Sequence, residues 1–292
     1  MDVKKPTVDD VRTFWENSPL FTGESQFDAG SAEFFKEHAR VIIDDGFVGT
    51  MDGRIFPSDR DNAVLDLGCG PGFWLTQFAA RGFRNLHGAD LTQRALELAA
   101  TRCRLLDIPC VFSRQNAESL TFADATFDHV NCQGVIHHTP NTEACVAEIA
   151  RVLKPGGTAS ISVYYQNVLM RNWWWLRHPA RLAMFLGAKL RGRGRESIYG
   201  CKDTSELVRL YDGQNNPVGK DYSKHTYQQM LTPYFDIVET FLHFFPARTL
   251  PIPMPRFVHR FLDRNVGFLI FAQVRKKKPG IGAQQIERRE AA

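Results

Sequence analysis

The sequence predicts a doubly wound α/β fold: a seven-stranded sheet, mostly parallel, with an antiparallel last strand. Three observations predict it. Apolar segments alternate with helical patterns over residues 61–166, and a glycine-rich turn follows the first apolar segment. Two further strand patterns near the C-terminus have only a proline-rich loop and a short helix between them. Alternation of this kind forms right-handed βαβ units, whereas strands without a full crossover helix form an antiparallel pair.

The elements of the central region follow from their apolar patterns. AVLDLG is a continuous apolar run ended by glycine, as expected of a buried parallel strand. The helix expected at residues 141–153 has Val146, Ile149, Ala150 and Leu153 at helical spacing and ends at KPGG. The other strands are expected at residues 85–90, 110–117, 127–135 and 158–165, and the other helices at 72–80 and 91–106.

Five regions are expected along the chain. Residues 1–60 form an N-terminal helical lid region, and residues 61–166 form the α/β core. Residues 167–220 interrupt the pattern with a basic, aromatic insertion that contains Trp173, Trp174 and Trp175. Residues 221–275 add a helix and two strands that complete the core. Residues 276–292 are charged and are expected to be disordered.

Composition limits the classes of protein that the chain can belong to. The net charge is +4, and residues 168–195 contain arginine and lysine but no acidic residue, so the remainder is slightly acidic. This distribution disfavours a nucleic-acid-binding face over the whole protein. The 6 cysteines form no CxxC pair and have no metal-ligand spacing, so no metal site is expected. Without a signal peptide or a run of 18 apolar residues, the chain is expected to be soluble and cytoplasmic.

The turn after the first strand is the most informative segment. Residues 64–72 read VLDLGCGPG. Glycines let the backbone approach a ligand without a Cβ clash, and open α/β sheets bind ligands at the carboxyl ends of their strands. The spacing is GxGxG with Asp66 two positions ahead, not the GxGxxG of dinucleotide sites. Because Asp66 would repel a pyrophosphate and suits an ammonium group, the turn disfavours an NAD-dependent dehydrogenase.

Polar residues follow the next three strands in the same way. Asp90 ends the second strand and is positioned to accept hydrogen bonds from a ribose diol. Asn116 and Ala117 end the third strand, and Gln133 ends the fourth, shortly before His137 and His138. A site assembled from four successive strand ends is far more specific than any one motif.

On these residues the chain resembles the class I S-adenosylmethionine-dependent methyltransferases, in the branch that acts on small molecules. VLDLGCGPG is similar to the first motif of that family, and GADLTQRALELA to its acidic second motif. NAESLTFADATFDHV resembles the D-A-E-x-L-P-F-x-D-x-x-F-D pattern, and GVIHHTPNTEACVAEIARVLKPGG the signature of the fourth strand and the following helix. The likeness covers residues 62–165 closely, and it implies a Rossmann-like fold with S-adenosylmethionine as cofactor.

The resemblance also implies roles for individual residues. Asp66 with Gly68, Cys69 and Gly70 would hold the methionine end, and Asp90 the ribose hydroxyls. Leu91 would pack on the adenine, Asn116 would face its amino group, Ala117 would offer its backbone N–H, and Gln133 would complete the site. Asn116 departs from the usual Asp of the family, and Thr121 departs from its Pro. An amide oxygen still accepts from an amine, so weaker recognition is expected.

Methyl transfer from a sulfonium is an in-line displacement, and the protein aligns the reactants, excludes water and in some cases removes a proton. The candidates for a base are His138 and, after it, His137, because imidazole has a suitable pKa. Tyr164 and Tyr165 end the fifth strand and could bind substrate, although one of them could equally be core. Trp15, with Phe21 and the three tryptophans, could form a lid over the site or an ordinary hydrophobic cap.

Several alternatives stay open at this point. An RNA-modifying methyltransferase would resemble enzymes with an N/D-P-P-Y/F element after the fourth strand, where this chain has Gln133-Gly134-Val135-Ile136. A catalytically silent S-adenosylmethionine-binding protein would have the same turn. The basic stretch over residues 171–195 could attract an anionic substrate, contact a membrane surface, or form a solvated helix face. O- or N-methylation is favoured. The sequence patterns indicate neither the identity of the methyl acceptor nor the oligomeric state.

Overall fold

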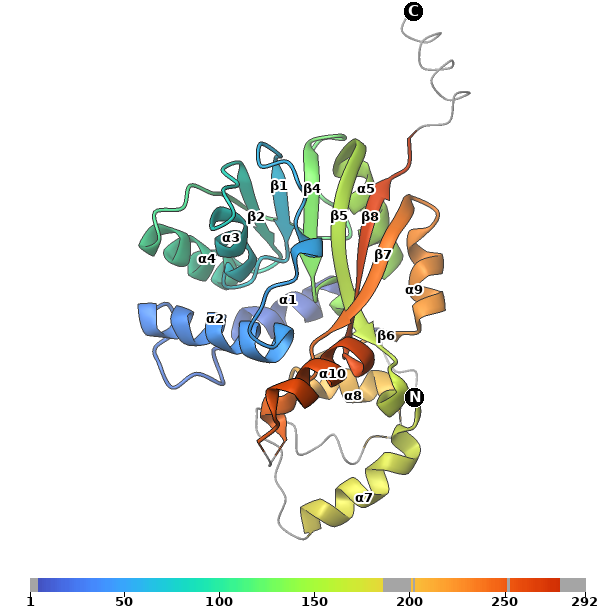
Figure 1. Cartoon of the computed structure of the whole chain (residues 1–292). Coiled ribbons are helices and arrows are strands. Elements are labelled where there is room, and N and C mark those ends of the chain that lie inside the picture. Colours follow the sequence, from blue (N-terminus) through green and yellow to red (C-terminus); the bar gives the residue numbers. More distant parts are fainter. Residues whose placement is uncertain (1–4, 186–200, 202, 251–252, 279–292) are drawn as a thin grey trace, which may run out of the picture.

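A computed structural model of the chain describes residues 5–185, 201, 203–250 and 253–278. These residues form one sheet with the strand order β3-β2-β1-β4-β5-β8-β7, and β6 pairs with β5 beside this path (Figure 1). Its strands are β1 (Val64–Leu67), β2 (Leu86–Asp90), β3 (Val111–Arg114), β4 (Phe127–Gln133), β5 (Leu153–Tyr165), β6 (Asp221–Tyr222), β7 (Phe235–His243) and β8 (Leu269–Lys276).

The strand directions confirm the predicted fold class. Strands β1 to β6 pair in parallel, and the last strand, β8, runs antiparallel to both of its neighbours. The sheet has one strand more than predicted, because β6 is only 2 residues long and so short a strand has no detectable period. Strand β5 also begins at Leu153, so the KPGG segment expected to end the preceding helix by a turn instead lies within this strand. The pairing of β5 with β4 is irregular there, between Phe127 and His129.

Helices cover both faces of the sheet. The helices are α1 (Val8–Asn17), α2 (Ala32–Phe47), α3 (Phe73–Ala79), α4 (Gln93–Leu105), α5 (Thr142–Val152), α6 (Val168–Arg171), α7 (Trp173–Phe185), α8 (Thr204–Tyr211), α9 (Lys224–Leu231) and α10 (Arg256–Val266), with short 3₁₀ turns η1 (Gly53–Ile55), η2 (Ile136–His138) and η4 (Ala247–Thr249). Within the described residues, no helix is long and apolar enough to cross a membrane. Residues 186–200 of the predicted insertion and 279–292 of the predicted tail lie outside this description.

Two cores form because successive side chains of a strand point to opposite faces. In β1, Val64 packs with the apolar sides of α3 and α4, whereas Leu65 and Leu67 pack with α5 and α9. All three side chains are buried, and their continuous apolar run is therefore the signature of a strand covered on both faces.

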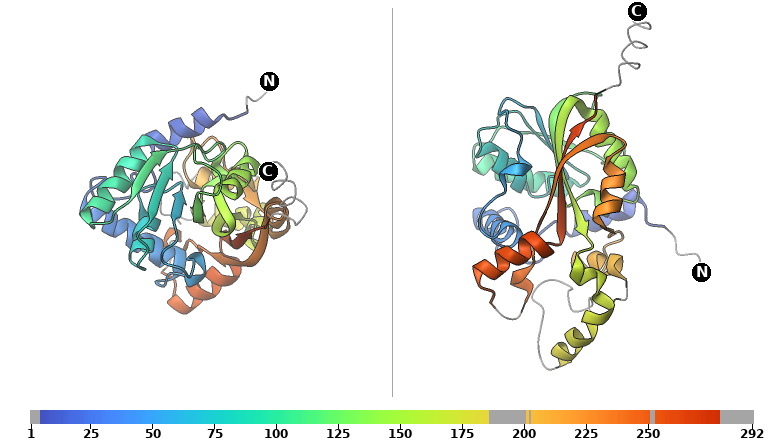
Figure 2. Two further views of the ribbon diagram at one scale, coloured as in Figure 1. Left: turned by 90° about the horizontal axis from the view of Figure 1, so that it is seen from above. Right: turned by 45° about the vertical axis from the view of Figure 1, so that its right-hand side comes forward.

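The N-terminal helices lie across the end of the sheet where β1 and β2 finish, as two views of the ribbon show (Figure 2). Helix α1 begins with a capping box in which Thr7 and Asp10 bind each other's backbone amides. At its other end, the carboxylate of Glu16 accepts hydrogen bonds from the amides of Gln93 and Arg94, at 2.9 and 3.0 Å. A carboxylate at a helix N-terminus is favourable, so Glu16 fixes α1 to the start of α4.

A buried histidine joins three segments at the end of β7. The Nδ1 atom of His243 lies 2.7 Å from Asp263 of α10, and its Nε2 atom lies 3.0 Å from Asp52, which caps η1. Burial alone would lower the pKa of His243, but its hydrogen bonds to Asp263 and Asp52 outweigh burial and raise the pKa. Protonated His243 therefore stabilises the fold, and it stays protonated up to pH values above the ordinary pKa of histidine.

We expect His243→Gln to destabilise the protein in a pH-dependent way. The raised pKa in the folded state means that the stabilisation is complete below the unfolded pKa of about 6.5 and is lost as the pH rises through the folded pKa. Chemical denaturation should show a cost of about 1–3 kcal/mol near pH 6 and a smaller cost near pH 9. The control His225→Gln, at an exposed position on α9, should leave the free energy of unfolding unchanged at both pH values. An equal cost of His243→Gln at the two pH values would show that the charge of His243 does not stabilise the fold.

Candidate cofactor and acceptor site

The glycine turn after β1 takes a conformation that favours glycine. Gly68, Gly70 and Gly72 have φ angles of 72°, 49° and 75°. The amides of Gly68 and Cys69 both donate to the carbonyl of Ala89 in β2, at 2.7 and 2.9 Å. A Cβ on Gly68 would lie 2.3 Å from Val135, whereas one on Gly70 would meet nothing within 4 Å. The turn therefore packs tightly on one side and leaves open space at Gly70.

The carboxylate of Asp90 connects this turn to the following helix. Its Oδ2 atom accepts from the amide of Gly70 at 3.0 Å, and its Oδ1 atom accepts from the amide and the hydroxyl of Thr92, both at 2.9 Å. Burial raises the pKa of Asp90, and the hydrogen bonds from Thr92 and Gly70 oppose that effect. Asp90 therefore holds two backbone segments together at the edge of a cavity.

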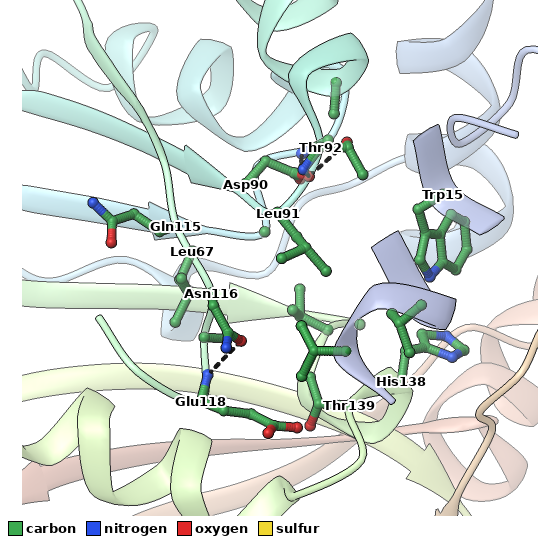
Figure 3. Close-up of a pocket in the computed structure, with 18 of the residues that line it drawn as sticks. Trp15, Leu67, Asp90, Leu91, Thr92, Gln115, Asn116, Glu118, His138 and Thr139 are labelled. Carbon is green, nitrogen blue, oxygen red and sulfur yellow. Dashed lines mark hydrogen bonds between the residues drawn. The ribbon is translucent and has the colours of Figure 1, made fainter. Parts of the chain in front are cut away.

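That cavity lies at the carboxyl ends of β1, β2 and β4, and we call it the cofactor cavity. Trp15 and His138 face it from the side opposite Asn116, with Asp90 and Leu91 between them (Figure 3). Of the residues predicted from sequence to hold the cofactor, its lining includes Gly68, Gly70, Asp90, Leu91, Asn116, Ala117 and Gln133. Asn116 also forms a turn, because its Oδ1 atom accepts from the amide of Glu118 at 3.0 Å.

Asp66 and Cys69 are not among the residues that line the cofactor cavity. Cys69 is buried with its side chain in the core on the α3–α4 face. Asp66 lies in a chain of hydrogen bonds beneath the strand ends: Asn131 donates to its Oδ1 atom at 2.7 Å, and Gln133 donates to the Oδ1 atom of Asn131 at 2.9 Å. Burial raises the pKa of Asp66 to about 7, against the opposing hydrogen bond from Asn131. Asp66 therefore supports Gln133 from below the cavity.

Two buried acceptors remain in this network. The Oδ2 atom of Asp66 and the Oε1 atom of Gln133 have no hydrogen-bond partner among the described residues. Buried polar atoms are normally partnered, and these two belong to acceptors beside the glycine turn. Of these two residues, Gln133 lines the cofactor cavity, so its Oε1 atom and the open space at Gly70 fit a ligand that brings a hydrogen-bond donor such as an ammonium group to this position, as the methionine end of S-adenosylmethionine does.

A second cavity adjoins the first, and we call it the acceptor cavity. Its wall includes the aromatic side chains of Phe21, Phe47, Trp74, Phe244 and Phe271, together with aliphatic, polar and charged residues. The two cavities share Trp15, Pro19, Leu20, Gln133, Gly134 and His138. Gly134 has a φ of 72°, and a Cβ there would meet nothing within 4 Å, so the junction between the cavities is open at this residue.

A polar cluster lies on the wall of the acceptor cavity next to this junction. The Nε2 atom of His138 lies 3.2 Å from Asp212, and the hydroxyl of Tyr164 donates to the same carboxylate at 3.1 and 3.2 Å. The Nδ1 atom of His138 lies 2.8 Å from the carbonyl of Val218. Both ring nitrogens of His138 therefore face oxygen acceptors, and its ring stands edge-on to Trp15 at 5.4 Å.

The other predicted residues of the acceptor side differ in position. His137 lines the acceptor cavity, and burial, followed by the nearby His138 and Lys220, lowers its pKa well below the ordinary value, so its ring is neutral. Tyr165 points away from both cavities and packs against the core on the α5–α9 face. The alternation of side chains along β5 explains why Tyr164 and Tyr165 lie on opposite faces.

Of three site residues that were not predicted, two have no clear signal in the sequence. Asp212 follows α8 in the predicted insertion and reaches His138 only through the fold. Glu16 acts on amides that are 77 and 78 positions away in the chain. Gly134 is the exception, because a glycine directly after a strand is a signal for a close approach of backbone and ligand.

Comparisons with known proteins agree with this geometry. Residues 65–161 match the family described as "Methyltransferase domain". The ubiquinone biosynthesis O-methyltransferase of Idiomarina loihiensis is 33% identical over 153 residues, which are 51% of this chain and 59% of that protein. The chain spans about half the length of the curated relatives it matches.

Solved structures share the fold at low identity. An S-adenosylmethionine-dependent methyltransferase from Methanosarcina mazei superposes with a TM-score of 0.51 at 23% identity, over 75% of this chain and 94% of that one. A chain from the complex between a methyltransferase activator and a methyltransferase of Haloferax volcanii has a TM-score of 0.55 at 17% identity, over 87% of this chain and 100% of that one. At such identities the likeness shows the fold.

Residues 65–161 match a methyltransferase domain family, and the fold and the strand-end site are those of the class I S-adenosylmethionine-dependent methyltransferases. Within the chain, residues 65–161 belong to the methyltransferase domain family, and the cofactor of this class is S-adenosylmethionine. The predicted class, fold and cofactor are thereby confirmed, while the roles of individual residues stay predictions.

We expect Gly70→Val to lower the affinity for S-adenosylmethionine by roughly 100-fold or more, because the side chain would fill the open space beside the turn. Gly82→Val is the matched control. Gly82 also has a positive φ, of 92°, and no neighbour within 4 Å of a Cβ, but it is exposed at the end of α3. Both variants therefore have comparable backbone strain, and calorimetric titration should show normal affinity only for Gly82→Val. Equal affinity for the two would show that the cofactor binds elsewhere.

Proposed function

We propose that the protein transfers the methyl group of S-adenosylmethionine to a hydroxyl group of a small, largely apolar acceptor. The observation that carries the proposal is the junction of two cavities at Gln133, Gly134 and His138. One cavity has the strand-end features of a cofactor site, and the other has an aromatic wall with a polar cluster beside the junction. A methyl group passed between them would cross at Gly134.

The lining of the acceptor cavity supports an aromatic or alkyl acceptor. Apolar side chains, aromatic rings among them, form more of its wall than polar ones do, and such a wall binds apolar ligands by excluding water. Arg248 also lines this cavity and donates hydrogen bonds to Glu24 and Asp45, which line it too, at 2.8 Å each. The names of several relatives, ubiquinone biosynthesis O-methyltransferases, agree with a hydroxyl acceptor.

The bound cofactor would supply an activated methyl group and a neutral thioether as leaving group. The task left to the chain is to orient the acceptor hydroxyl and to take its proton. Asp212 suits this task better than His138, because both nitrogens of His138 already face oxygen atoms, whereas a carboxylate oxygen that has one partner can still accept a further hydrogen bond. We assign Asp212 as the proton acceptor, and His138 and Tyr164 as the groups that hold its carboxylate in place. His137 has a neutral ring and forms part of the cavity wall.

The direct test of the proposal uses labelled cofactor. The full-length protein should be incubated with S-adenosylmethionine that carries a labelled methyl group and with a panel of phenols, catechols and their alkylated forms. Product mass spectrometry should detect methyl ethers. Methylation of an RNA pool instead of any small molecule, or cofactor binding without any product, would overturn the proposal.

Once a methyl acceptor has been identified, we expect Asp212→Asn to lower kcat on the order of 10²–10⁴-fold while the affinity for S-adenosylmethionine stays unchanged. Tyr164→Phe, which removes one hydrogen bond to Asp212, should lower kcat on the order of tenfold. Tyr165→Phe is the matched control, because Tyr165 points into the core and should leave kcat near the wild-type value. Full activity of Asp212→Asn would remove Asp212 from the reaction and leave alignment and exclusion of water as the function of the cluster.

A further inference from the structure

Helix α10 has an unusual distribution of side chains. It buries His259 and Asp263, which are 7% and 2% exposed, and it presents Phe257 and Phe261 to solvent, 77% and 65% exposed. Surface helices normally do the opposite, with an apolar face inward. Hydrogen bonds fix this orientation: Asp263 binds His243, and His259 lies 2.9 Å from the carbonyl of Phe245. The two phenylalanines are therefore held outward by the fold.

Arginines accompany this aromatic pair. Arg256, Arg260 and Arg264 follow one another at i, i+4 and i+8 along α10, and all three are exposed. The acidic residue of the helix, Asp263, is buried against His243. Within the described part of the chain, Arg260 and Arg264 lie within salt-bridge distance of no carboxylate, and Arg256 lies 3.9 Å from Asp44. The exposed side of α10 is thus both aromatic and positively charged.

Helix α7 repeats this combination at the same end of the molecule, as Figures 1 and 2 show. Trp174 and Trp175 are 57% and 62% exposed, and Arg181 is also exposed. The helix contains no acidic residue. Trp173 anchors it, because the indole N–H of Trp173 donates to the carbonyl of Cys201 at 3.2 Å. Helix α7 thus lies at the same end of the molecule as a second helix with the same chemistry, which the sequence patterns did not connect to it.

We propose that the exposed sides of α7 and α10 form a docking surface for an anionic lipid bilayer. Tryptophan and phenylalanine insert at the boundary between headgroups and acyl chains, and arginines bind the phosphates of anionic lipids. Charge complementarity selects this occupant, because the exposed residues of both helices include arginines and no carboxylate. A single-stranded nucleic acid would need a groove along which bases stack, whereas these side chains project from two helices. The inference does not depend on the identity of the methyl acceptor.

The test is sedimentation of the full-length protein with vesicles of phosphatidylcholine alone or mixed with phosphatidylglycerol. The wild-type protein should bind the mixed vesicles, more weakly as salt is added, and should bind pure phosphatidylcholine much less. The aromatic variant Phe257→Ser/Phe261→Ser and the charge variant Arg260→Gln/Arg264→Gln should each lower binding to mixed vesicles by roughly tenfold or more. Their affinity for S-adenosylmethionine should equal that of the wild type, which shows that they are folded.

A matched control lies on another face of the molecule. Leu105 and Leu106, at the end of α4, are 54% and 56% exposed, and Arg104 beside them is exposed as well. The variant Arg104→Gln/Leu105→Ser/Leu106→Ser removes a similar amount of apolar surface and charge, and it should bind vesicles like the wild type. The proposal would be overturned if the wild-type protein did not bind vesicles, or if the control variant lost as much vesicle binding as the α10 variants. It would also be overturned if the protein preferred single-stranded nucleic acid to the mixed vesicles.

Discussion

The site depends on one carboxylate, that of Asp90, which accepts hydrogen bonds from the backbone at Gly70 and Thr92. These bonds hold the glycine turn against the start of α4 and leave open space at Gly70. Glu16 of α1 then binds the next two amides of α4, so α1 is fixed to the same helix N-terminus. The cofactor cavity is consequently defined by two acidic side chains at the first turn of α4, where the helix dipole favours them.

The acceptor cavity is completed by a segment far away in the chain. The carbonyl of Val218 and the carboxylate of Asp212 bind the two ring nitrogens of His138, so the residues after α8 and those after β4 hold each other in place. Two-residue strand β6, which pairs with the end of β5, keeps this segment next to Tyr164. The predicted insertion thus has a structural link to the site: it contributes Asp212 and fixes the orientation of His138.

The sequence predicted those parts of the protein that depend on local patterns. The buried strands, the glycine turn and the position of Asp90 follow from apolar runs and from residues at strand ends, and the structure has them in the predicted order. The direction of side chains could not be predicted from these patterns: Asp66 lies near the end of β1 and Gln133 ends β4, yet of the two only Gln133 lines the cavity. Pairings such as His138 with Asp212 and Glu16 with α4 depend on tertiary packing, and β6 is too short to have a pattern. The start of β5 was misplaced because KPGG is typical of a turn, whereas β5 pairs with β4 on both sides of this segment, at Leu153 and again from Thr158.

The His243 cluster connects the proposed docking surface with the acceptor cavity. Asp263 and Asp52 hold His243 at the end of β7, and this arrangement fixes the exposed side of α10 outward. Helix α10 packs on β7 and α2, and Phe47 at the end of α2 and Phe244 just after β7 are part of the aromatic wall of the acceptor cavity. A bilayer bound to α10 would therefore lie close to the elements that form this wall. An acceptor with an alkyl chain could then pass from the lipid to the cavity over a short path, which would explain why an aromatic cavity and an aromatic, basic surface occur at one end of the same protein.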